Sequence, residues 1–302
     1  MFTVKNVRKE FIVDFWKDPF VALEDLSFEI EEGKITGFLG ANGAGKTTFL
    51  KILLQFIQPT KGEISYVDGI SQKEFLKRLG YMPERPYYYE YLTGREFLRY
   101  CGKLQDLSDK KIDEAIDLWT NELKVNFALD RSIKSYSKGM LQRVGFASAL
   151  LHDPKLVVLD EPLSGLDPVG RKEFKDILLK INQEYGCTVF FSSHIVSDVE
   201  EVSENVVVID KGALVYQGRI NDLLSRASSK LIKIEISELT ETIKSNSDSM
   251  IEKTASGVND YVYCSRENKE ELLKSIISEG VEVISLVHEN YSLEEVVYKL
   301  NE

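Results

Sequence analysis

The sequence contains Gly40-Ala41-Asn42-Gly43-Ala44-Gly45-Lys46-Thr47-Thr48, with the spacing G-x-x-x-x-G-K-T of a phosphate-binding loop. Its glycines let backbone N–H groups close around phosphate oxygens, because no Cβ blocks the approach. Lys46 would bring positive charge to the β- and γ-phosphates, and the Thr47 hydroxyl is suited to hold Mg²⁺. Residues 34–39 before the loop have a strand pattern, and residues 49–54 after it are apolar at helical spacing, which predicts a helix that ends near Pro59. This order aims a helix N-terminus at an anion, so the stretch predicts a nucleotide site.

A second chemical motif follows an apolar segment, residues 156–159, which ends in Asp160 and Glu161. Ligands bind at the carboxyl ends of parallel strands, so Asp160 is expected beside the phosphate loop (residues 40–48), where it can hold Mg²⁺. Glu161, one residue later, can orient or deprotonate an attacking water. A strand that runs into an acidic surface turn is the plain alternative. The phosphate loop earlier in the chain favours the catalytic interpretation.

The composition of the 302 residues, 43% hydrophobic and 29% charged, is typical of a soluble globular protein. No apolar run reaches membrane-spanning length, and the N-terminus lacks a signal-peptide layout. We therefore expect a cytoplasmic protein that is peripheral on the inner face of the cell membrane through another protein. The formal net charge of −11 without a basic stripe argues against nucleic acid as the main partner. Cys101, Cys187 and Cys264 have no metal or redox spacing, so free thiols are expected.

The order of the predicted elements indicates an α/β fold. Residues 1–33 have the pattern of an antiparallel β region, and residues 85–152 are mostly helical. Residues 155–160 and 187–192 look like buried strands with a helix over 171–185 between them, which indicates a parallel sheet covered on both faces.

The composition shifts near residue 219. Beyond it, residues 220–302 hold 9 basic and 16 acidic residues, in a pattern that predicts a small α+β domain. The expected strands there cover 231–236, 259–264 and 281–287. A loop is expected over 245–249, with helices over 269–278 and 293–300. We therefore predict two domains, a nucleotide-binding domain over 1–219 and an acidic accessory domain over 220–302.

Between the phosphate loop and Asp160 the chain reads Ser135-Tyr136-Ser137-Lys138-Gly139-Met140-Leu141-Gln142-Arg143. Here it resembles the ATP-binding cassette (ABC) family, whose signature at this place is usually Leu-Ser-Gly-Gly-Gln. Ser137 and Gly139 are retained, whereas Tyr136, Lys138 and Met140 depart from the commonest form, in a variant similar to one branch of bacterial cassettes. From the residues alone, the Ser137 hydroxyl, the Gly139 N–H and the helix dipole form an anion site. A plain helix cap is an equal alternative.

The resemblance covers most of residues 1–220 and implies further roles. The stretch Leu163-Ser164-Gly165-Leu166-Asp167 resembles the D-loop, which crosses the dimer interface of cassettes. Ser192-Ser193-His194 resembles the end of a strand that carries the switch histidine, which contacts the γ-phosphate. His152 and His288 have no such context, so we expect them to be structural.

Two positions of the family pattern are less regular in this chain. The aromatic residue that stacks on adenine aligns with Phe11, but the loop after it is long, so Phe15, Trp16 and Phe20 are alternatives. Glu84 stands where the family's Q-loop usually has Gln. A second carboxylate near the triphosphate adds repulsion, so a coupling role is expected for Glu84 rather than Mg²⁺ contact. The aromatic run over 86–91 either lines a groove for a partner helix or packs under the helical subdomain.

The chain has one phosphate loop and one signature. In the resembled family these meet across a head-to-tail dimer, so Ser137, Lys138 and Gly139 would act on the nucleotide of the partner chain. The resemblance implies an ATPase that uses ATP and Mg²⁺, pairs with a second cassette as a homodimer or heterodimer, and powers a separate membrane permease. Export is the favoured direction. ATP binding would close the dimer and hydrolysis would open it.

Other function classes fit the sequence less well. The first is a soluble ABC-type ATPase that acts as a conformational switch on a non-membrane partner. Ribosome-acting cassettes resemble two cassettes in one chain with a basic linker, and chromosome ATPases carry a long coiled coil; neither feature is in this sequence. A degenerate cassette that binds ATP only as a scaffold is disfavoured by Lys46, Asp160, Glu161 and His194, which are all in place.

Overall fold

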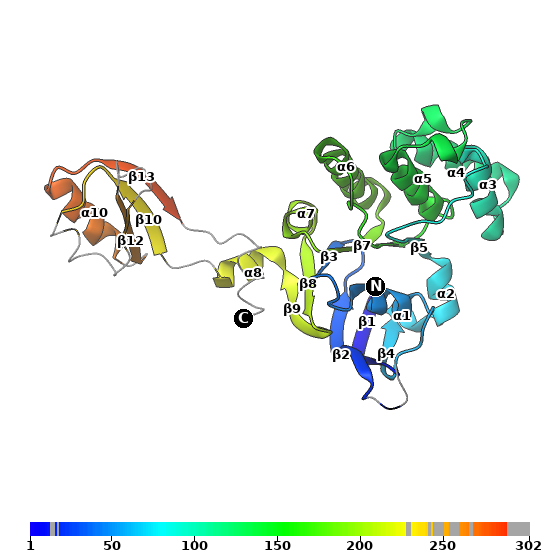
Figure 1. Ribbon diagram of the computed structural model, residues 1–302, viewed down its shortest axis with the longest axis horizontal. Coiled ribbons are helices and arrows are strands. Elements are labelled where there is room, and N and C mark those ends of the chain that lie inside the picture. Colours follow the sequence, from blue (N-terminus) through cyan, green and yellow to red (C-terminus); the bar gives the residue numbers. More distant parts are fainter. Residues whose placement is uncertain are drawn as a thin grey trace. The chain divides into compact units, whose positions relative to one another are not determined.

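The computed structural model describes residues 1–12, 16, 18–227, 231–240, 243, 251–253, 260–265 and 268–288. Its internal contacts divide the chain into two compact units, Met1–Ile220 and a second one that begins at Asn221 (Figure 1). The domain limits proposed from the sequence, 1–219 and 220–302, lie one residue from this division.

A six-stranded sheet forms the centre of the first unit, in the order β5-β6-β7-β3-β8-β9. The strands are Leu79–Met82, Leu156–Leu159, Thr188–Ser193, Ile35–Leu39, Asn205–Asp210 and Ala213–Arg219, in that order. The first five are parallel, and β9 runs antiparallel to β8. Strands β6, β7 and β3 are neighbours, so their carboxyl ends share one edge of the sheet. Ligands bind at such an edge in parallel sheets.

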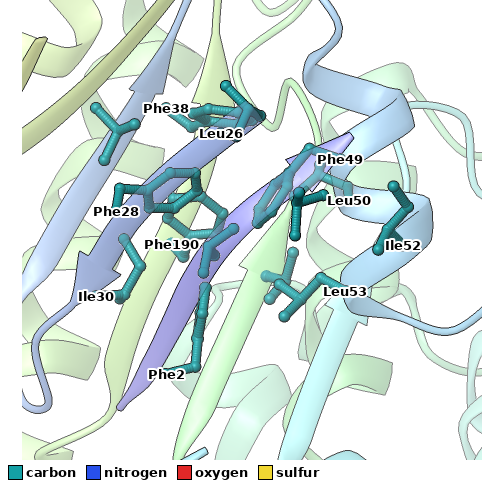
Figure 2. Close-up of a cluster of buried hydrophobic side chains, with 14 of the residues drawn as sticks. Phe2, Leu26, Phe28, Ile30, Phe38, Phe49, Leu50, Ile52, Leu53 and Phe190 are labelled. Carbon is teal, nitrogen blue, oxygen red and sulfur yellow. The ribbon is translucent and has the colours of Figure 1, made fainter. Parts of the chain in front are cut away.

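A smaller antiparallel sheet has the order β2-β1-β4 (Phe20–Ile30, Phe2–Phe11 and Lys61–Tyr66). Helix α1 (Lys46–Leu53) packs against both sheets (Figure 2). Its Phe49 ring lies 5.0 Å from the ring of Phe28 in β2 and 5.4 Å from that of Phe38 in β3. All three rings are buried, and burial of this kind stabilises by about 1.5–3 kcal/mol per large side chain. The packing of Phe49 therefore fixes the helix that begins at Lys46.

Helices α3 (Gly94–Leu104), α4 (Asp109–Glu122) and α5 (Lys138–Leu150) pack together as a helical subdomain, within the range predicted over 85–152. Thr93 and Glu96 form a capping box at the start of α3, which satisfies backbone N–H groups that a helix leaves unpaired. The remaining helices of this unit are α2 (Gln72–Lys77), α6 (Pro168–Tyr185) and α7 (Val196–Val202), and α8 covers Ile220–Ala227.

The second unit holds a four-stranded antiparallel sheet in the order β11-β12-β10-β13. Its strands cover Ile251–Lys253, Asp260–Ser265, Leu231–Ile236 and Val283–His288. Helix α10 (Lys269–Ser278) buries Leu272 and Ile276 in the same apolar cluster as Ile234. These elements match the expected α+β pattern. The loop expected over 245–249 and the helix expected over 293–300 lie outside the described residues. Within the described part of the chain, no helix is long and apolar enough to cross a membrane.

Several elements differ from the expectations. Helix α1 ends at Leu53 rather than near Pro59, because Gln55 has a left-handed backbone with φ of 62°. The sequence pattern does not predict strand β5, which has four residues and includes Gly80. Glycine is required at position 80 because a Cβ there would lie 2.0 Å from the Ala149 carbonyl oxygen. Strand β9 is a partly exposed edge strand of mixed polarity, so it lacks the apolar run that marks buried strands.

Candidate active site

The phosphate loop connects β3 to α1, as its flanking pattern predicts. Gly43 and Gly45 have φ values of 85° and 107°, a region that side chains with a Cβ rarely adopt. At Gly45 a Cβ would also lie 2.6 Å from Leu23 Cδ2 and 2.8 Å from the Ala22 carbonyl oxygen. The loop therefore depends on glycine both for its backbone shape and for its close approach to β2.

Lys46 begins α1 and folds its side chain back over the loop. Its ammonium donates to the Gly40 carbonyl oxygen at 2.6 Å and lies 3.3 Å from Glu161 Oε1. The side chain is only 7% exposed, and a buried ammonium needs such acceptors to offset the loss of water. Phosphate oxygens entering the loop would compete with Gly40 and Glu161 for this ammonium.

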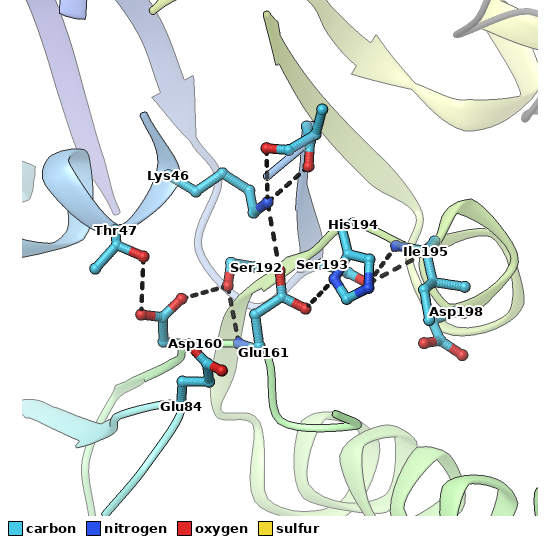
Figure 3. Close-up of polar contacts among 12 residues, drawn as sticks. Lys46, Thr47, Glu84, Asp160, Glu161, Ser192, Ser193, His194, Ile195 and Asp198 are labelled. Carbon is cyan, nitrogen blue, oxygen red and sulfur yellow. Dashed lines mark hydrogen bonds and ion pairs between the residues drawn. The ribbon is translucent and has the colours of Figure 1, made fainter. Parts of the chain in front are cut away.

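Asp160 follows β6 and lies next to Thr47 (Figure 3). The Ser192 hydroxyl donates to Asp160 Oδ1 at 2.6 Å, and the Thr47 hydroxyl donates to Oδ2 at 3.3 Å. Burial raises the pKa of the Asp160 carboxyl, and the negative charges of Glu161 and Glu84 act in the same direction. The Thr47 hydroxyl and the Asp160 carboxylate therefore lie together in a buried environment that disfavours an uncompensated negative charge.

Glu161 leaves the strand through a left-handed backbone with φ of 49°, a conformation that non-glycine residues adopt rarely and often at functional sites. Its N–H donates to the Ser192 hydroxyl at 2.8 Å. Its carboxylate lies between two nitrogen groups, the Lys46 ammonium at 3.3 Å and His194 Nδ1 at 2.8 Å (Figure 3). The structure therefore brings the predicted Lys46, Glu161 and His194 together from three separate elements.

These groups open into one cleft of about 460 Å³, which we name the nucleotide cleft. Its lining residues come from β2, the phosphate loop and the ends of β5, β6 and β7: Phe20, Ala22, Ala41, Asn42, Gly43, Gly45, Lys46, Thr47, Thr48, Glu84, Glu161, Ser164 and His194.

Of the aromatic candidates for stacking on adenine, Phe20 lines the nucleotide cleft, whereas Phe11 and Trp16 are not among its lining residues. Phe11 is the neighbour of Phe20 across the β1–β2 ladder, and the Lys9 ammonium lies 5.1 Å from the centre of its ring. Phe15 lies outside the described residues. Phe20 is therefore the candidate best placed to meet a base.

The signature residues lie on a different surface. Ser137 caps α5, accepting from the Met140 N–H at 3.3 Å, and Asp167 caps α6, accepting from the Gly170 N–H at 2.8 Å. Together with Lys138 and Gly139 they line a second hollow, which we name the signature hollow. It shares no lining residue with the nucleotide cleft. One copy of the chain thus does not bring its own Ser137 to its own phosphate loop.

The comparisons agree with this architecture. The ABC transporter family profile matches residues 23–164. An uncharacterized ABC transporter ATP-binding protein of Nostoc sp. is 41% identical over 72% of this chain and 66% of its own length. The uncharacterized ABC transporter ATP-binding protein YdbJ of Bacillus subtilis is 30% identical over 90% and 88%, and the bacitracin transport ATP-binding protein BcrA of Bacillus licheniformis is 32% identical over 92% of each.

The chain belongs to the family of ABC transporter ATP-binding proteins. Its match spans just under two thirds of the first two relatives, 66% and 63% of their lengths. A solved ATP-binding subunit of an ABC transporter superposes with a TM-score of 0.64 at 26% identity, over 75% of this chain and 92% of that one. A dimeric post-hydrolysis cassette bound to ADP and phosphate has the same fold, with a TM-score of 0.66 at 22% identity over 73% and 99%.

No role was predicted from the sequence for two polar residues of this ABC cassette that make contacts at the site. Ser192 contacts both Asp160 and Glu161. Because Leu159 pairs with Phe191 in the parallel ladder, the next residues, Asp160 and Ser192, lie at the same level, so the strand register could have identified this contact. Gln142 is buried and donates to the Pro162 carbonyl oxygen at 2.5 Å, which holds the segment after Glu161 against α5. No spacing rule marks Gln142, because its acceptor is a backbone group 20 residues away.

Proposed function

We propose that this cassette binds and hydrolyses ATP in the nucleotide cleft and thereby powers a separate membrane permease, with export as the direction. One observation carries the proposal: Lys46, Glu161 and His194 line a single cleft together with the glycine loop, and the buried Asp160 contacts Thr47, which lines the same cleft. The transporter role draws support from the relative named for bacitracin transport, which matches over 92% of its own length. No described feature favours the soluble switch over this role. The permease would hold the chain at the cytoplasmic face of the membrane.

The oxygen donors beside the phosphate loop fit Mg²⁺. The Thr47 hydroxyl and the Asp160 carboxylate meet at 3.3 Å, and hard oxygen ligands of this kind, few in number, suit Mg²⁺ bound together with phosphate. Burial that disfavours a lone Asp160 charge also favours a nearby cation. We propose that Thr47 and Asp160 hold the ion, which would neutralise charge on the phosphates.

Glu161 is the group best placed to act on the attacking water. Without nucleotide its carboxylate faces Lys46 at 3.3 Å and His194 at 2.8 Å. Phosphate oxygens would take over the Lys46 ammonium, since charge-assisted bonds to phosphate are strong, and Glu161 would then be free to accept a proton from water. His194, at the end of β7, would orient this carboxylate and contact the γ-phosphate.

Asp160→Asn should stabilise the nucleotide-free protein at neutral pH while removing Mg²⁺-dependent hydrolysis. The raised pKa of Asp160 means that the folded state disfavours its charge. The contribution of Asp160 to stability therefore falls as pH rises from the ordinary carboxyl pKa through the raised one. Thermal unfolding without Mg²⁺ should show a higher Tm for the variant at pH 7. That gain should shrink in acid, where the wild-type carboxyl is protonated in both states. A lower Tm at pH 7 would contradict this account.

Phe20→Ala should weaken ATP binding by about tenfold, the lower part of the range for base–aromatic stacking of ~1–3 kcal/mol. Phe20 lines the nucleotide cleft, whereas Phe11 is not among its lining residues, so Phe11→Ala is the matched control and should change the affinity little. Calorimetry with ATP and with inorganic triphosphate measures both. Triphosphate has no base, so its binding should be insensitive to Phe20→Ala. An equal loss for both ligands would indicate a collapsed cleft instead.

The separation of the nucleotide cleft from the signature hollow supports a dimer. We propose that Ser137, Lys138 and Gly139 of one copy complete the site of the other in a head-to-tail arrangement. Gly139 is open, because a Cβ there would meet only Leu166 Cδ2, at 3.8 Å, so a phosphate could approach the start of α5. The anion would meet backbone N–H groups and the positive end of the helix dipole.

A third hollow, the tyrosine groove, offers a docking place for the permease. It is lined by Glu84, Arg85, Pro86, Tyr87, Tyr88, Glu90, Ile133, Lys134, Tyr136, Lys138, Leu141 and Gln142. Tyr87 is 82% exposed, while the Tyr88 hydroxyl donates to the Leu141 carbonyl oxygen at 2.5 Å. Thus Tyr88 packs against the helical subdomain, as one of the two alternatives predicts, whereas the exposed Tyr87 is available to a partner. Glu84 lines this groove and the nucleotide cleft, which suits its proposed coupling role.

Capture of the tagged chain from cells opened in mild detergent tests the transporter role. We expect a polytopic membrane protein to copurify, and Tyr87→Ala should reduce its recovery. Tyr100→Ala is the control, because Tyr100 is also exposed but does not line the tyrosine groove. Recovery of ribosomal or soluble partners without a membrane protein would favour the soluble switch.

A further inference from the structure

Two loops of the proposed active site each lead into a helix: the D-loop precedes α6, and the segment with His194 precedes α7. Asp167 of the D-loop (residues 163–167) caps α6, and Arg171 follows one turn later, with its N–H donating to the Asp167 carbonyl oxygen at 2.9 Å. His194 precedes α7, and Asp198 follows it by the same four positions. Arg171 therefore lies one turn into α6, and Asp198 lies in the first turn of α7, so each follows one of the two loops closely.

These two side chains form an ion pair whose carboxylate is buried. The Arg171 guanidinium donates to Asp198 Oδ2, and the Lys175 ammonium lies 3.0 Å from Oδ1 of the same carboxylate. The Asp198 side chain is only 4% exposed. Lys175 has a second partner, Glu201 at 2.8 Å, so it retains an acceptor if Asp198 is changed. Breaking an ion pair at a buried carboxylate is costly, so the contacts of Asp198 with Arg171 and Lys175 hold α7 firmly against α6.

The pair lies directly behind the catalytic groups. A small hollow between them is lined by Glu161, Ser164, Arg171, His194, Ile195 and Asp198, among others, and Figure 3 places Asp198 beside Ile195 and His194. The turn from His194 into α7 is itself fixed, because the Ser193 hydroxyl accepts from the Ile195 N–H at 3.0 Å and donates to its carbonyl oxygen at 3.2 Å. A shift of α7 would therefore carry His194 with it.

We propose that Arg171 is a positioning residue for ATP hydrolysis, which acts through Asp198 to hold His194 and the D-loop as one rigid body. This inference rests on the proposed function. The γ-phosphate would bias the position of His194, the dimer partner would bias the D-loop, and the Arg171–Asp198 pair transmits each influence to the other. Such coupling between two sites is reciprocal and typically changes an affinity by about 5–150-fold.

Steady-state hydrolysis over a range of ATP concentrations tests the proposal in the full chain. Arg171→Gln should lower kcat by about tenfold, since misplacement of a catalytic group by about 1 Å can cost ~10²-fold. The Hill coefficient for ATP should fall towards about 1, since the two sites of a dimer no longer sense each other. Asp198→Asn should match it, and the double variant should be no worse than either single one, because each single variant already removes the Arg171–Asp198 pair. Arg171→Lys keeps the charge and should recover part of kcat.

Lys175→Gln is the control, because it removes the other cation on Asp198 but leaves Arg171 in place. Lys175→Gln should keep kcat and the Hill coefficient near the wild-type values, even if Lys175→Gln and Arg171→Gln both lower Tm. Equal losses in Arg171→Gln and Lys175→Gln would show a merely structural cluster and overturn the inference. If the wild type hydrolyses ATP and Arg171→Gln has the same kcat and Hill coefficient, the inference about Arg171 is overturned but the proposed function is not. If the wild type shows no turnover, the proposed function is overturned as well. If Arg171→Gln does not fold, Arg171→Lys decides, since full wild-type kcat and cooperativity there would count against a positioning role.

Discussion

Glu161→Gln is expected to lower the turnover number for ATP by ~10²–10⁴-fold, the usual contribution of a general base. The amide keeps the size of the side chain, so the contact with His194 at 2.8 Å can persist, but it cannot accept a proton from water. It also removes the negative charge that lies 3.3 Å from Lys46, so ATP binding should be retained or slightly strengthened. Phosphate release at saturating ATP measures the first effect, and equilibrium binding measures the second.

The control for this variant is Glu184→Gln, which changes an exposed carboxylate near the end of α6 and should leave turnover unchanged. Steady hydrolysis unaffected by Glu161→Gln would rule out the role assigned to Glu161. A loss of turnover that came with an equal loss of ATP binding would also contradict it, because the carboxylate would then be needed for the site rather than for the chemical step.

Lys46→Ala is expected to weaken ATP binding by ~30-fold to ~5,000-fold, since loss of one partner of a buried charged contact costs about 2–5 kcal/mol. In the nucleotide-free protein the change also leaves Glu161 without its cation and the Gly40 carbonyl oxygen without its donor. Binding of a fluorescent ATP analogue, followed by competition with ATP, gives the affinity.

Lys51→Ala is the matched control for Lys46→Ala. Both lysines belong to α1, but Lys51 is exposed in its last turn, so its removal should leave ATP affinity unchanged. Equal affinities in Lys46→Ala and wild type would contradict the assignment of the phosphate loop. A similar loss in both variants would point instead to a general effect of positive charge on this surface.

The arrangement of the candidate site is largely predictable because its parts are local in sequence. The phosphate loop, with its glycines and Lys46, is one continuous stretch, and Asp160 and Glu161 end an apolar strand. Parallel strand order then dictates that these ends share an edge of the sheet. The contact of His194 with Glu161 at 2.8 Å follows from the same order, since β6 and β7 are neighbours.

Other features depend on contacts that no local pattern encodes. Phe11 and Phe20 are cross-strand partners and share one face of the sheet, so the choice of Phe20 depends on which strand borders the nucleotide cleft, and that strand is β2. The Arg171–Asp198 pair joins helices whose charged residues resemble ordinary surface positions until packing buries the carboxylate. Short or edge strands such as β5 and β9 carry too little periodicity to be recognised, because tertiary contacts rather than propensity decide them.

ATP-dependent dimerisation of Glu161→Gln tests the central claim most directly, since the account requires two copies to enclose each nucleotide between a nucleotide cleft and a signature hollow. The molar mass in solution, measured by light scattering during size-exclusion chromatography, should double with ATP and Mg²⁺ but not with ADP. Addition of Ser137→Arg, which fills the signature hollow, should abolish the doubling without loss of ATP binding. A mass that stays the same with ATP and with ADP, in a protein shown to bind ATP, would contradict the account.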